Sequence, residues 1–391
     1  MTNSTVPTSP LLLQRPVLAL VLLLLSALTL AHGATPRRAI SLRSQAAALL
    51  DWKSTLKHYS EHQLGTWSSN VHPCNWTGVT CGDVVVVPHR RPPARTPAIT
   101  GLSLQGANLV GELDTLRLQS LPYLTSFDLS DNAYLSGTIP PGISSLSLLS
   151  IFNISGDHLT GEIPPTFGDL GSLTKMDLSN NNLSGRIPPA LGNLSRLTSL
   201  YLFGNNLTGN IPWKLGKLQY MEYLDLSGNL LHGEIPSTLG NLRNLNTLAL
   251  SGNHLSGPIP EDLGKLPMLQ MLILNQNNLN GTVPSSLGNL TTLTYLYLYL
   301  NQHTGLISDD LGKLMSLIEL DLSENHFTGS VPSSVAGNLT SSTYLSVWGN
   351  HITGSIPHEI GNLVNLEQLD LSANFISGPI PPTIGNMYVL P

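Results

Sequence analysis

One short block of sequence recurs along most of this chain. "SGNLLHGEIPSTLGNLRNLNTLAL" (Ser227–Leu250) is followed at once by "SGNHLSGPIPEDLGKLPMLQMLIL" (Ser251–Leu274), and each block has 24 residues. Leu, Asn, Gly, Pro and Leu return in the same columns, while the residues between them change. A short fixed period predicts a stack of similar units in place of a single globular core, because each unit packs only against its neighbours.

The aligned units read L-x-x-L-x-L-x-x-N-x-L-x-G-x-I-P-x-x-L-G-x-L, and twelve follow one another in steps of 24 or 25 residues. Within "LxL" the two leucines point to one side and the middle residue to the other, as in a short β-strand. We therefore predict an α/β solenoid, a right-handed superhelix with a parallel β-sheet on its concave face and a helical cap at the N-terminus.

The asparagine column has a structural explanation. An inward-facing amide can both donate to and accept from backbone groups that would otherwise be buried without partners. Asp157 keeps only the acceptor role when it is ionised, and Ala107 keeps neither role, so we expect weaker turns there. The predicted structural ladder is Asn132, Asn181, Asn205, Asn229, Asn253, Asn277, Asn301, Asn325, Asn350 and Asn374.

The N-terminus has the layout of a secretory signal. Arg15 precedes an unbroken apolar run, Val17–Leu30, and the small residues of Ala31–Gly33 offer a cleavage point before Ala34. A membrane anchor is the weaker alternative, because the run is shorter than the roughly 20 residues that span a bilayer. We expect residues 1–33 to be a signal peptide and the chain to be secreted, or to lie on the extracellular face of the plasma membrane if a longer product exists.

Cysteines and glycosylation triplets agree with secretion. Cys74 and Cys81 are close enough to form one local disulfide in an oxidising compartment, with two free buried thiols as the alternative. Asn-x-Ser/Thr triplets are candidate N-glycosylation sites, although an Asn-rich repeat also produces them by chance. They begin at Asn75, Asn153, Asn182, Asn193, Asn206, Asn280, Asn289 and Asn338.

The repeat resembles the plant-type leucine-rich repeat, in particular its "LxGxIPxxLGxL" half, from Ile99 to the C-terminus. "SQAAALLDWKSTL" (Ser44–Leu56) and "LGTWSSNVHPCNWTGVTC" (Leu64–Cys81) resemble the N-terminal cap of plant leucine-rich-repeat receptor-like kinases. The first segment has its apolar residues near helical spacing. In the second, Trp67 and Trp76 are available to cover the leucines of the first repeat.

These features divide the chain into a cap with one disulfide (34–82), a basic, proline-rich segment (83–98) and the repeats (99–391). The middle segment is longer than the usual link of the resembled family, and we expect a mobile loop. The sequence "IGNMYVLP" stops where a thirteenth unit would begin, without a C-terminal cap, a membrane span or a kinase domain. We expect either a natural secreted product or a truncated receptor.

The variable residues beside the strand leucines are predicted to face the concave surface. Solvent-facing aromatic side chains are good anchors for a partner, although tyrosine also favours strands for packing reasons. At about 4.8 Å per strand, the six steps from Phe203 to Trp348 span about 29 Å, which fits an extended peptide of about nine residues. The predicted ligand-binding residues are Tyr201, Phe203, Tyr223, Met271, Ile273, Tyr295, Tyr297, Tyr299, Glu319, Asp321, Tyr344 and Trp348.

Acidic residues are also predicted on this face: Asp225, Glu319, Asp321, Glu324 and Asp370. Three of them belong to "LDLS", a favoured form of the repeat, so a structural role is the simpler alternative. A functional role would favour a ligand that carries some positive charge. Members of the resembled family that read peptide carboxyl ends use a concave Arg-x-Arg pair, and the repeats contain no such pair.

Motifs for catalysis or for metal and nucleotide binding are weak. "HYSEH" (His58–His62) matches the zinc-peptidase pattern H-x-x-E-H but has no evident third ligand, and "LGKL" (Leu215–Leu218) lacks the spacing of a phosphate-binding loop. Charged residues make up 11% of the chain and the net charge is −6, which leaves no basic face for nucleic acid. We expect no enzymatic activity, no cofactor, no metal and no nucleic-acid partner.

The resemblance implies the extracellular ectodomain of a plant receptor-like kinase or receptor-like protein. Such an ectodomain would recognise a peptide or protein ligand in signalling or defence, and a leucine-rich-repeat co-receptor kinase is a further implied partner. The alternative is a secreted inhibitor of microbial cell-wall-degrading enzymes, a class of similar length and repeat that usually carries cysteine pairs at both ends.

Overall fold

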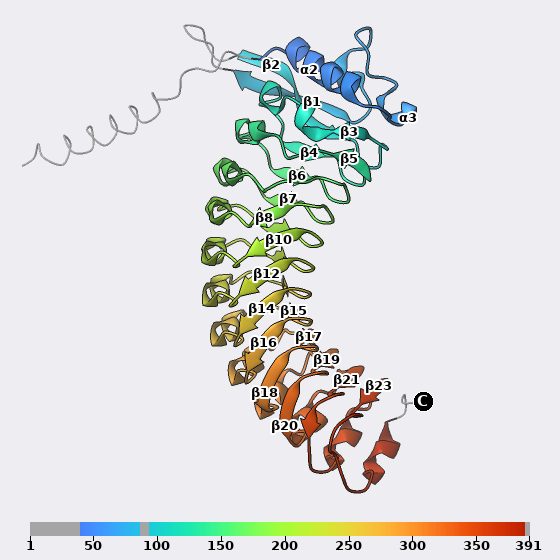
Figure 1. Ribbon diagram of the computed structural model, residues 1–391, viewed down its shortest axis with the longest axis vertical. Helices are drawn as coiled ribbons and strands as arrows, with labels where there is room; N and C mark the ends of the chain where they lie inside the picture. The colour runs from blue at the N-terminus through green and yellow to red at the C-terminus, as the bar shows by residue number, and fades with distance from the viewer. Residues whose placement is uncertain (1–39, 87–93, 388–391) are drawn as a thin grey trace, which may run out of the picture.

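The computed structural model describes residues 40–86 and 94–387, and the predicted signal peptide lies outside this range. The described residues form one curved stack of repeats that begins at an N-terminal helical cap (Figure 1). The predicted solenoid of parallel strands is confirmed. None of the helices in the described part of the chain has both the length and the apolar character of a membrane span.

A 13-stranded sheet lines the inner side of the arc. Only its first pair is antiparallel, and every later strand pairs in parallel with the same residue of the next repeat, as Tyr223 does with Thr247. In spatial order the strands are β1 (Val79–Val86), β2 (Ala94–Ser103), β4 (Ser126–Asp128), β6 (Ile151–Asn153), β7 (Lys175–Asp177), β9 (Ser199–Tyr201), β11 (Tyr223–Asp225), β13 (Thr247–Ala249), β15 (Met271–Ile273), β17 (Tyr295–Tyr297), β19 (Glu319–Asp321), β21 (Tyr344–Ser346) and β23 (Gln368–Asp370).

A second parallel sheet of eight strands, which the sequence analysis did not predict, lies behind the first. It forms where each unit passes from the asparagine to the glycine before Ile-Pro, so the prolines follow the strands. Its strands are β8 (Ser184–Arg186), β10 (Asn206–Gly209), β12 (Leu230–Gly233), β14 (His254–Gly257), β16 (Asn278–Gly281), β18 (Gln302–Leu306), β20 (His326–Gly329) and β22 (His351–Ile352), and a separate pair joins β3 (Val110–Glu112) to β5 (Tyr134–Ser136).

Short helices, nearly all of them 3-10 turns, cover the outer side of the arc (Figure 1). From η5 to η12 they stack closely because each has a glycine facing the next helix, and a Cβ on Gly216 would overlap the carbonyl oxygen of Thr238. The 3-10 helices of the repeats are η2 (Leu113–Thr115), η3 (Leu118–Ser120), η4 (Pro141–Ser145), η5 (Pro165–Asp169), η6 (Pro189–Asn193), η7 (Trp213–Lys217), η8 (Ser237–Asn241), η9 (Glu261–Lys265), η10 (Ser285–Asn289), η11 (Asp309–Lys313), η12 (His358–Asn362) and η13 (Pro382–Asn386), and one unit has an α-helix instead, α4 (Ser333–Asn338).

The asparagine column ties each unit to the one before it. Asn181 Nδ2 donates to the carbonyl oxygens of Ile154, Leu178 and Ser179 at 2.8, 3.2 and 3.1 Å, and its Oδ1 accepts from the backbone N–H of Leu159 at 3.0 Å. The backbone groups that a tight turn would leave buried and unpaired therefore gain partners. An amide oxygen accepts a backbone N–H of the preceding unit in the same way at Asn132, Asn205, Asn229, Asn253, Asn277, Asn301, Asn325, Asn350 and Asn374.

The cap closes the N-terminal end of this core. It consists of α2 (Leu42–Thr55), α3 (Glu61–Leu64) and η1 (Pro73–Asn75). Trp67 and Trp76 are buried and stack with ring centroids 5.3 Å apart, in the same hydrophobic cluster as Leu102 of the first repeat. The predicted disulfide between Cys74 and Cys81 is confirmed.

The segment 83–98, which we expected to be a mobile loop, is in part a β-hairpin. Strand β1 continues beyond the cap, and Asp83, Val84 and Val85 pair antiparallel with Pro97, Thr96 and Arg95 of β2. Consecutive valines favour an extended strand, and Pro97 is tolerated because the hairpin projects at the edge of the sheet. Only residues 87–93 of the segment lie outside the described range.

Candidate functional site

The exposed side of the 13-stranded sheet, called the inner wall below, presents one row of side chains per repeat. The leucines of each strand are buried, as Leu224 and Leu296 show, so the flanking residues face solvent. Because the pairing is in register, equivalent residues form columns along the arc, as in the run Tyr201, Asp225, Ala249. The strands thus place all the predicted ligand-binding residues on one surface.

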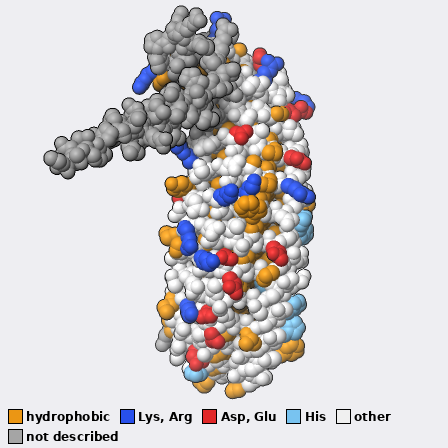
Figure 2. All heavy atoms as spheres, turned by 90° about the vertical axis from the view of Figure 1, so that its left-hand side faces the viewer, with side chains coloured by type: hydrophobic (Ala, Val, Ile, Leu, Met, Phe, Trp, Pro, Cys, Tyr) orange, Lys and Arg blue, Asp and Glu red, His pale blue; other side chains and the backbone are white. Residues whose placement is uncertain are grey.

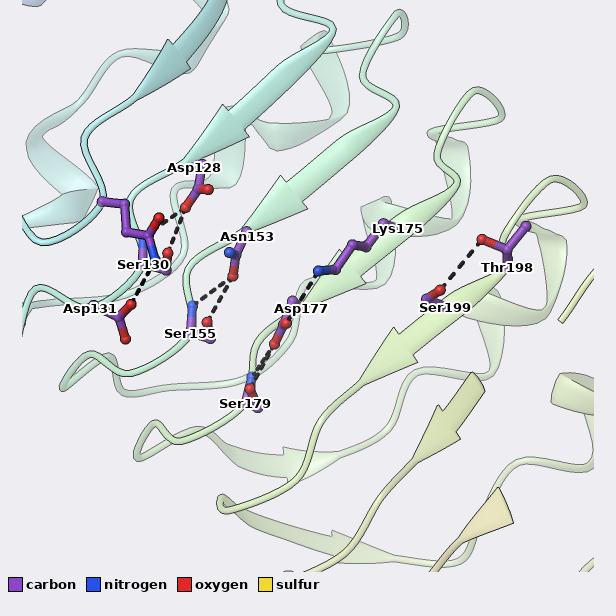
Figure 3. A network of polar contacts seen from close by, with 11 residues as sticks. Asp128, Ser130, Asp131, Asn153, Ser155, Lys175, Asp177, Ser179, Thr198 and Ser199 are labelled. Atoms are coloured by element: carbon purple, nitrogen blue, oxygen red, sulfur yellow. Dashed lines mark hydrogen bonds and ion pairs between the residues drawn. The ribbon is translucent and has the colours of Figure 1, made fainter. Parts of the chain in front are cut away.

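The N-terminal half of the inner wall is polar and internally bonded (Figure 3). Asp128 and Asp177 each accept hydrogen bonds from the backbone N–H and the hydroxyl of the serine two residues later, at 2.7 to 3.2 Å. Asn153 accepts the same two hydrogen bonds from Ser155 through its amide oxygen. Lys175 approaches Asp177 at 3.8 Å and the ring of Tyr201 at 5.5 Å. Polar groups on this half therefore largely satisfy one another.

The C-terminal half is aromatic and acidic. Tyr295, Tyr297 and Tyr299 stand in a line on and just after β17, with successive ring centroids 6.2 Å apart and the rings tilted by 63° and 58°. All three are half-buried, because each ring leans on its neighbours. Such packing holds the rings in place before any ligand arrives, which lowers the entropy lost on binding.

Carboxylates lie among these rings. The hydroxyl of Tyr297 donates to Glu319 Oε2 at 2.5 Å, and the hydroxyl of Tyr344 lies 3.4 Å from Asp321 Oδ2. Burial raises the pKa of Tyr297, Tyr299 and Tyr344 above the ordinary value of 10.0, and the negative charges of Glu319 and Asp321 raise it further. These tyrosines are therefore neutral hydrogen-bond donors at neutral pH.

The other predicted contact residues divide into two groups. Tyr201, Phe203 and Tyr223 form an earlier cluster, which β13, with its small residues, separates from the tyrosine line. Trp348 lies beyond that line and is 38% exposed, close to the 37% of Tyr223. Met271 and Ile273 lie on β15 beside Tyr295 and Tyr297, and both are half-buried. The wall therefore has two aromatic clusters of unequal size.

In each aspartate of "LDLS", one carboxylate oxygen has a structural role. Asp225, Asp321 and Asp370 each accept from the N–H of the serine two residues later through Oδ1, at 2.9 to 3.0 Å. Burial raises the pKa of Asp225. Asn275 lies on the wall next to Tyr299 and was not among the predicted contact residues. It is 5% exposed, and its Oδ1 has no hydrogen-bond partner within the described structure. The sequence does mark this position, because asparagine replaces the serine that occupies the same column as Ser251 and Ser323 in nearby repeats.

Charge is segregated between the two sides of the arc. After Ser199 the chain has five basic residues, and all of them lie on or beside the outer helices: Lys214, Lys217, Arg243, Lys265 and Lys313. Figure 2 looks onto that outer face, where lysine and arginine side chains appear among acidic ones. The C-terminal half of the inner wall therefore carries carboxylates and no lysine or arginine.

The triplet asparagines have different surroundings. Asn153 lies on the inner wall, and its amide oxygen is engaged by Ser155. The others are exposed: Asn75, Asn182, Asn193, Asn206, Asn280, Asn289 and Asn338. Within the tyrosine-rich half of the wall no predicted glycosylation site is present.

The H-x-x-E-H letters do not lie on one helix. His58 forms a β-bridge with Val110, and α3 begins only at Glu61. In the described residues, no three histidine, cysteine or acidic side chains converge as a metal site would require.

Known protein families match the chain along most of its described length. The leucine-rich-repeat N-terminal domain matches residues 42–82. Leucine-rich-repeat models match residues 163–207, 220–242, 244–266, 268–290, 316–338, 341–363 and 365–387. The LRR receptor-like serine/threonine-protein kinase RGI3 of Arabidopsis thaliana is 35% identical over 112 residues, which are 28% of this chain and 9% of that kinase.

Solved structures agree. The PEPR1–AtPEP1 complex is 31% identical, with a TM-score of 0.81, and the match covers 89% of this chain and 48% of that one. The Arabidopsis receptor kinase HAESA ectodomain, solved with an IDA peptide hormone ligand, is 31% identical with a TM-score of 0.70, over 90% of this chain and 60% of that one. This chain thus corresponds to about half of such ectodomains, which are extracellular. The chain is a leucine-rich-repeat protein that is homologous to the plant leucine-rich-repeat receptor-like kinases.

Proposed function

We propose that this chain is an extracellular recognition module that binds an extended peptide, or an extended segment of a protein, along its inner wall. The observation that carries the proposal is the line of Tyr295, Tyr297 and Tyr299, held side by side on the wall, with Trp348 two rows further along the same surface. Rigid aromatic side chains with a polar end are typical anchors of binding surfaces. The HAESA ectodomain, whose fold this chain shares, was solved with a peptide ligand.

The same proposal includes a role in signalling or defence. A receptor role requires a transmembrane and kinase portion in a longer product, with which the repeats would act as the sensing part. A leucine-rich-repeat co-receptor kinase would then join the ligand-bound wall. A stand-alone product would bind its ligand without transmitting a signal.

Removal of the aromatic anchors tests the proposal. The triple variant Tyr297→Ala, Tyr299→Ala, Trp348→Ala should lose capture of peptides from extracellular plant fluid, measured by mass spectrometry of the bound fraction, while secretion is unchanged. Each buried anchor is worth about 2 kcal/mol or more, so binding should fall by at least about a hundredfold.

Trp213→Ala is the matched control. Trp213 is 56% exposed on η7, where Lys217 lies 5.3 Å from its ring, on the outer side of the arc. Its removal should leave capture intact. Equal capture by the wild type and the triple variant would refute the inner wall as the binding surface. Capture of an intact cell-wall-degrading enzyme in place of peptides would favour the inhibitor alternative.

A further inference from the structure

We propose that the inner wall around Asp321 is a receptor site for one cationic side chain, an arginine or a lysine, of the bound peptide. The inference rests on the proposed function, because it takes a peptide along the wall as its starting point. It adds the chemistry that the peptide must carry and the place where that chemistry is recognised.

Asp321 lies among three tyrosines and keeps an oxygen available. Its Oδ1 accepts from the N–H and the hydroxyl of Ser323 at 2.9 and 2.5 Å, whereas Oδ2 has one long contact, 3.4 Å from the hydroxyl of Tyr344. Tyr297 is the register partner of Asp321 in the sheet, Tyr299 follows two residues later on the same side, and Tyr344 lies on the next strand with its hydroxyl near Oδ2. A carboxylate among aromatic rings is a favourable site for a cation, which the ring faces also attract.

Asn275 is an independent sign of a missing donor. The residue is 5% exposed, and its Oδ1 is buried without a hydrogen-bond partner among the residues that the structure describes. Asn275 lies in the row next to Tyr299, since the N–H of the following residue, Gln276, donates to the carbonyl of Tyr299 at 2.9 Å. A buried acceptor without a donor destabilises the folded chain. Rotation of the Asn275 side chain toward the wall would let a ligand N–H group meet this oxygen and remove that deficit.

Residues 40–86 and 94–387 offer no lysine or arginine to these acceptors. The ion pairs found among the described residues join Lys175 to Asp177, Lys265 to Asp262, Lys313 to Asp310 and His358 to Glu359, and they leave Glu319 and Asp321 without a basic partner. Free carboxylate and amide oxygens accept hydrogen bonds only, and guanidinium and ammonium groups only donate them. The two sets of groups are therefore complementary.

The aromatic surroundings favour an organic cation. Tyrosine rings contact the flat face of a guanidinium or the methylene groups of a lysine, and both side chains combine an apolar stem with a charged end. A divalent metal would need several oxygen ligands at one point, and the described residues provide no such cluster. The site fits a basic residue near the middle of an extended peptide that also contacts Met271 and Trp348.

A random nonapeptide library displayed on phage is the probe, selected on the immobilised full chain. The wild type should enrich arginine or lysine at one position of the selected peptides. Asp321→Asn keeps the size of the side chain and removes the charge, and it should weaken binding of a selected basic peptide by about tenfold. Asn275→Ser, which installs the residue that Ser251 provides in the preceding repeat, should weaken binding of the same peptide by a smaller factor.

Asp177→Asn is the matched control, because Asp177 accepts the same two hydrogen bonds from its serine on the polar half of the wall. It should bind the basic peptide as the wild type does, and equal melting temperatures of the variants would confirm that all of them fold. Selection of peptides with no basic preference would overturn the inference and leave peptide binding standing. Failure to select any peptide would refute the proposed function itself. Equal losses in Asp177→Asn and Asp321→Asn would also overturn the inference, because they would reveal a general effect of net charge.

Discussion

At the scale of single residues, Asp157 makes the stability of the repeat stack depend on pH. The residue occupies the asparagine column, its Oδ1 accepts from the N–H of Asn132 at 2.7 Å, and its Oδ2 has no partner in the described structure. Burial raises the pKa of Asp157 from 3.8 to about 8. The folded chain therefore retains a proton that the unfolded chain releases above about pH 4, and stability falls as the pH rises from about 4 to about 8.

Asp157→Asn should remove this dependence. The amide can donate where the ionised carboxylate cannot, so the variant should be more stable than the wild type by about 1–3 kcal/mol near pH 8 and nearly equal to it near pH 4. Urea denaturation at both pH values measures the difference. If the difference in the free energy of unfolding between the two chains were the same at both pH values, a buried, protonated Asp157 would be contradicted.

His303 provides a control of opposite sign. It occupies a leucine column, is fully buried and stacks on Phe327 with ring centroids 6.1 Å apart. Burial lowers the pKa of His303 from 6.5 to about 4, so the folded chain excludes a proton that the unfolded chain binds. The free energy of unfolding therefore decreases as the pH falls from about 6.5 to about 4. His303→Leu should therefore stabilise the chain most in acid, where Asp157→Asn has least effect.

At the scale of elements, the disulfide of the cap should protect the first repeat. Cys74 and Cys81 are seven residues apart and hold the loop that carries the buried Trp76. Closing so short a loop stabilises by about 2–3 kcal/mol in the chain-entropy model. The double variant Cys74→Ser, Cys81→Ser should accelerate hydrogen exchange in α2, β1 and β2 and leave β15 to β21 unchanged, because each unit packs only on its neighbours. Uniform acceleration along the array would contradict this local coupling.

The elements differ in how far the sequence predicts them. The leucine and asparagine columns predict the inner sheet. Alternating leucines place one face of a short strand in the core, and the buried amides need backbone partners in the turn that follows. The second sheet was not predicted because its strands have two to five residues and all but β22 contain glycine, which strand propensity disfavours. The hairpin was missed because proline and arginine suggested a loop, whereas pairing with the valine run decided the structure.

The candidate site was predictable in position and only partly in chemistry. Strand alternation alone places Tyr297 and Asp321 on the wall. The hydrogen bond between Tyr297 and Glu319 and the unpaired oxygen of Asn275 depend on side-chain conformations that a repeat pattern does not specify. The available oxygen of Asp321 was likewise not predictable, because the sequence context indicates only the hydrogen bond between Asp321 and Ser323.

At the scale of the whole molecule, the curved stack separates two surfaces of different character. The outer helices and the turns beside them carry all the lysine and arginine that follow Ser199, and the inner wall carries tyrosines and carboxylates. A basic ligand would therefore be attracted to the concave side over a distance of about one Debye length, roughly 8–10 Å at physiological salt. The charge distribution would therefore steer an approaching basic ligand toward the inner wall before any contact forms.

Hydroxyl-radical footprinting of the full chain, with and without a selected basic nonapeptide, tests the central claim most directly. Bound peptide should protect Tyr295, Tyr297, Tyr299 and Trp348 on the inner wall and leave the exposed Trp213 of the outer face as reactive as before. Protection of Trp213, with the wall tyrosines unchanged, would contradict recognition by the inner wall.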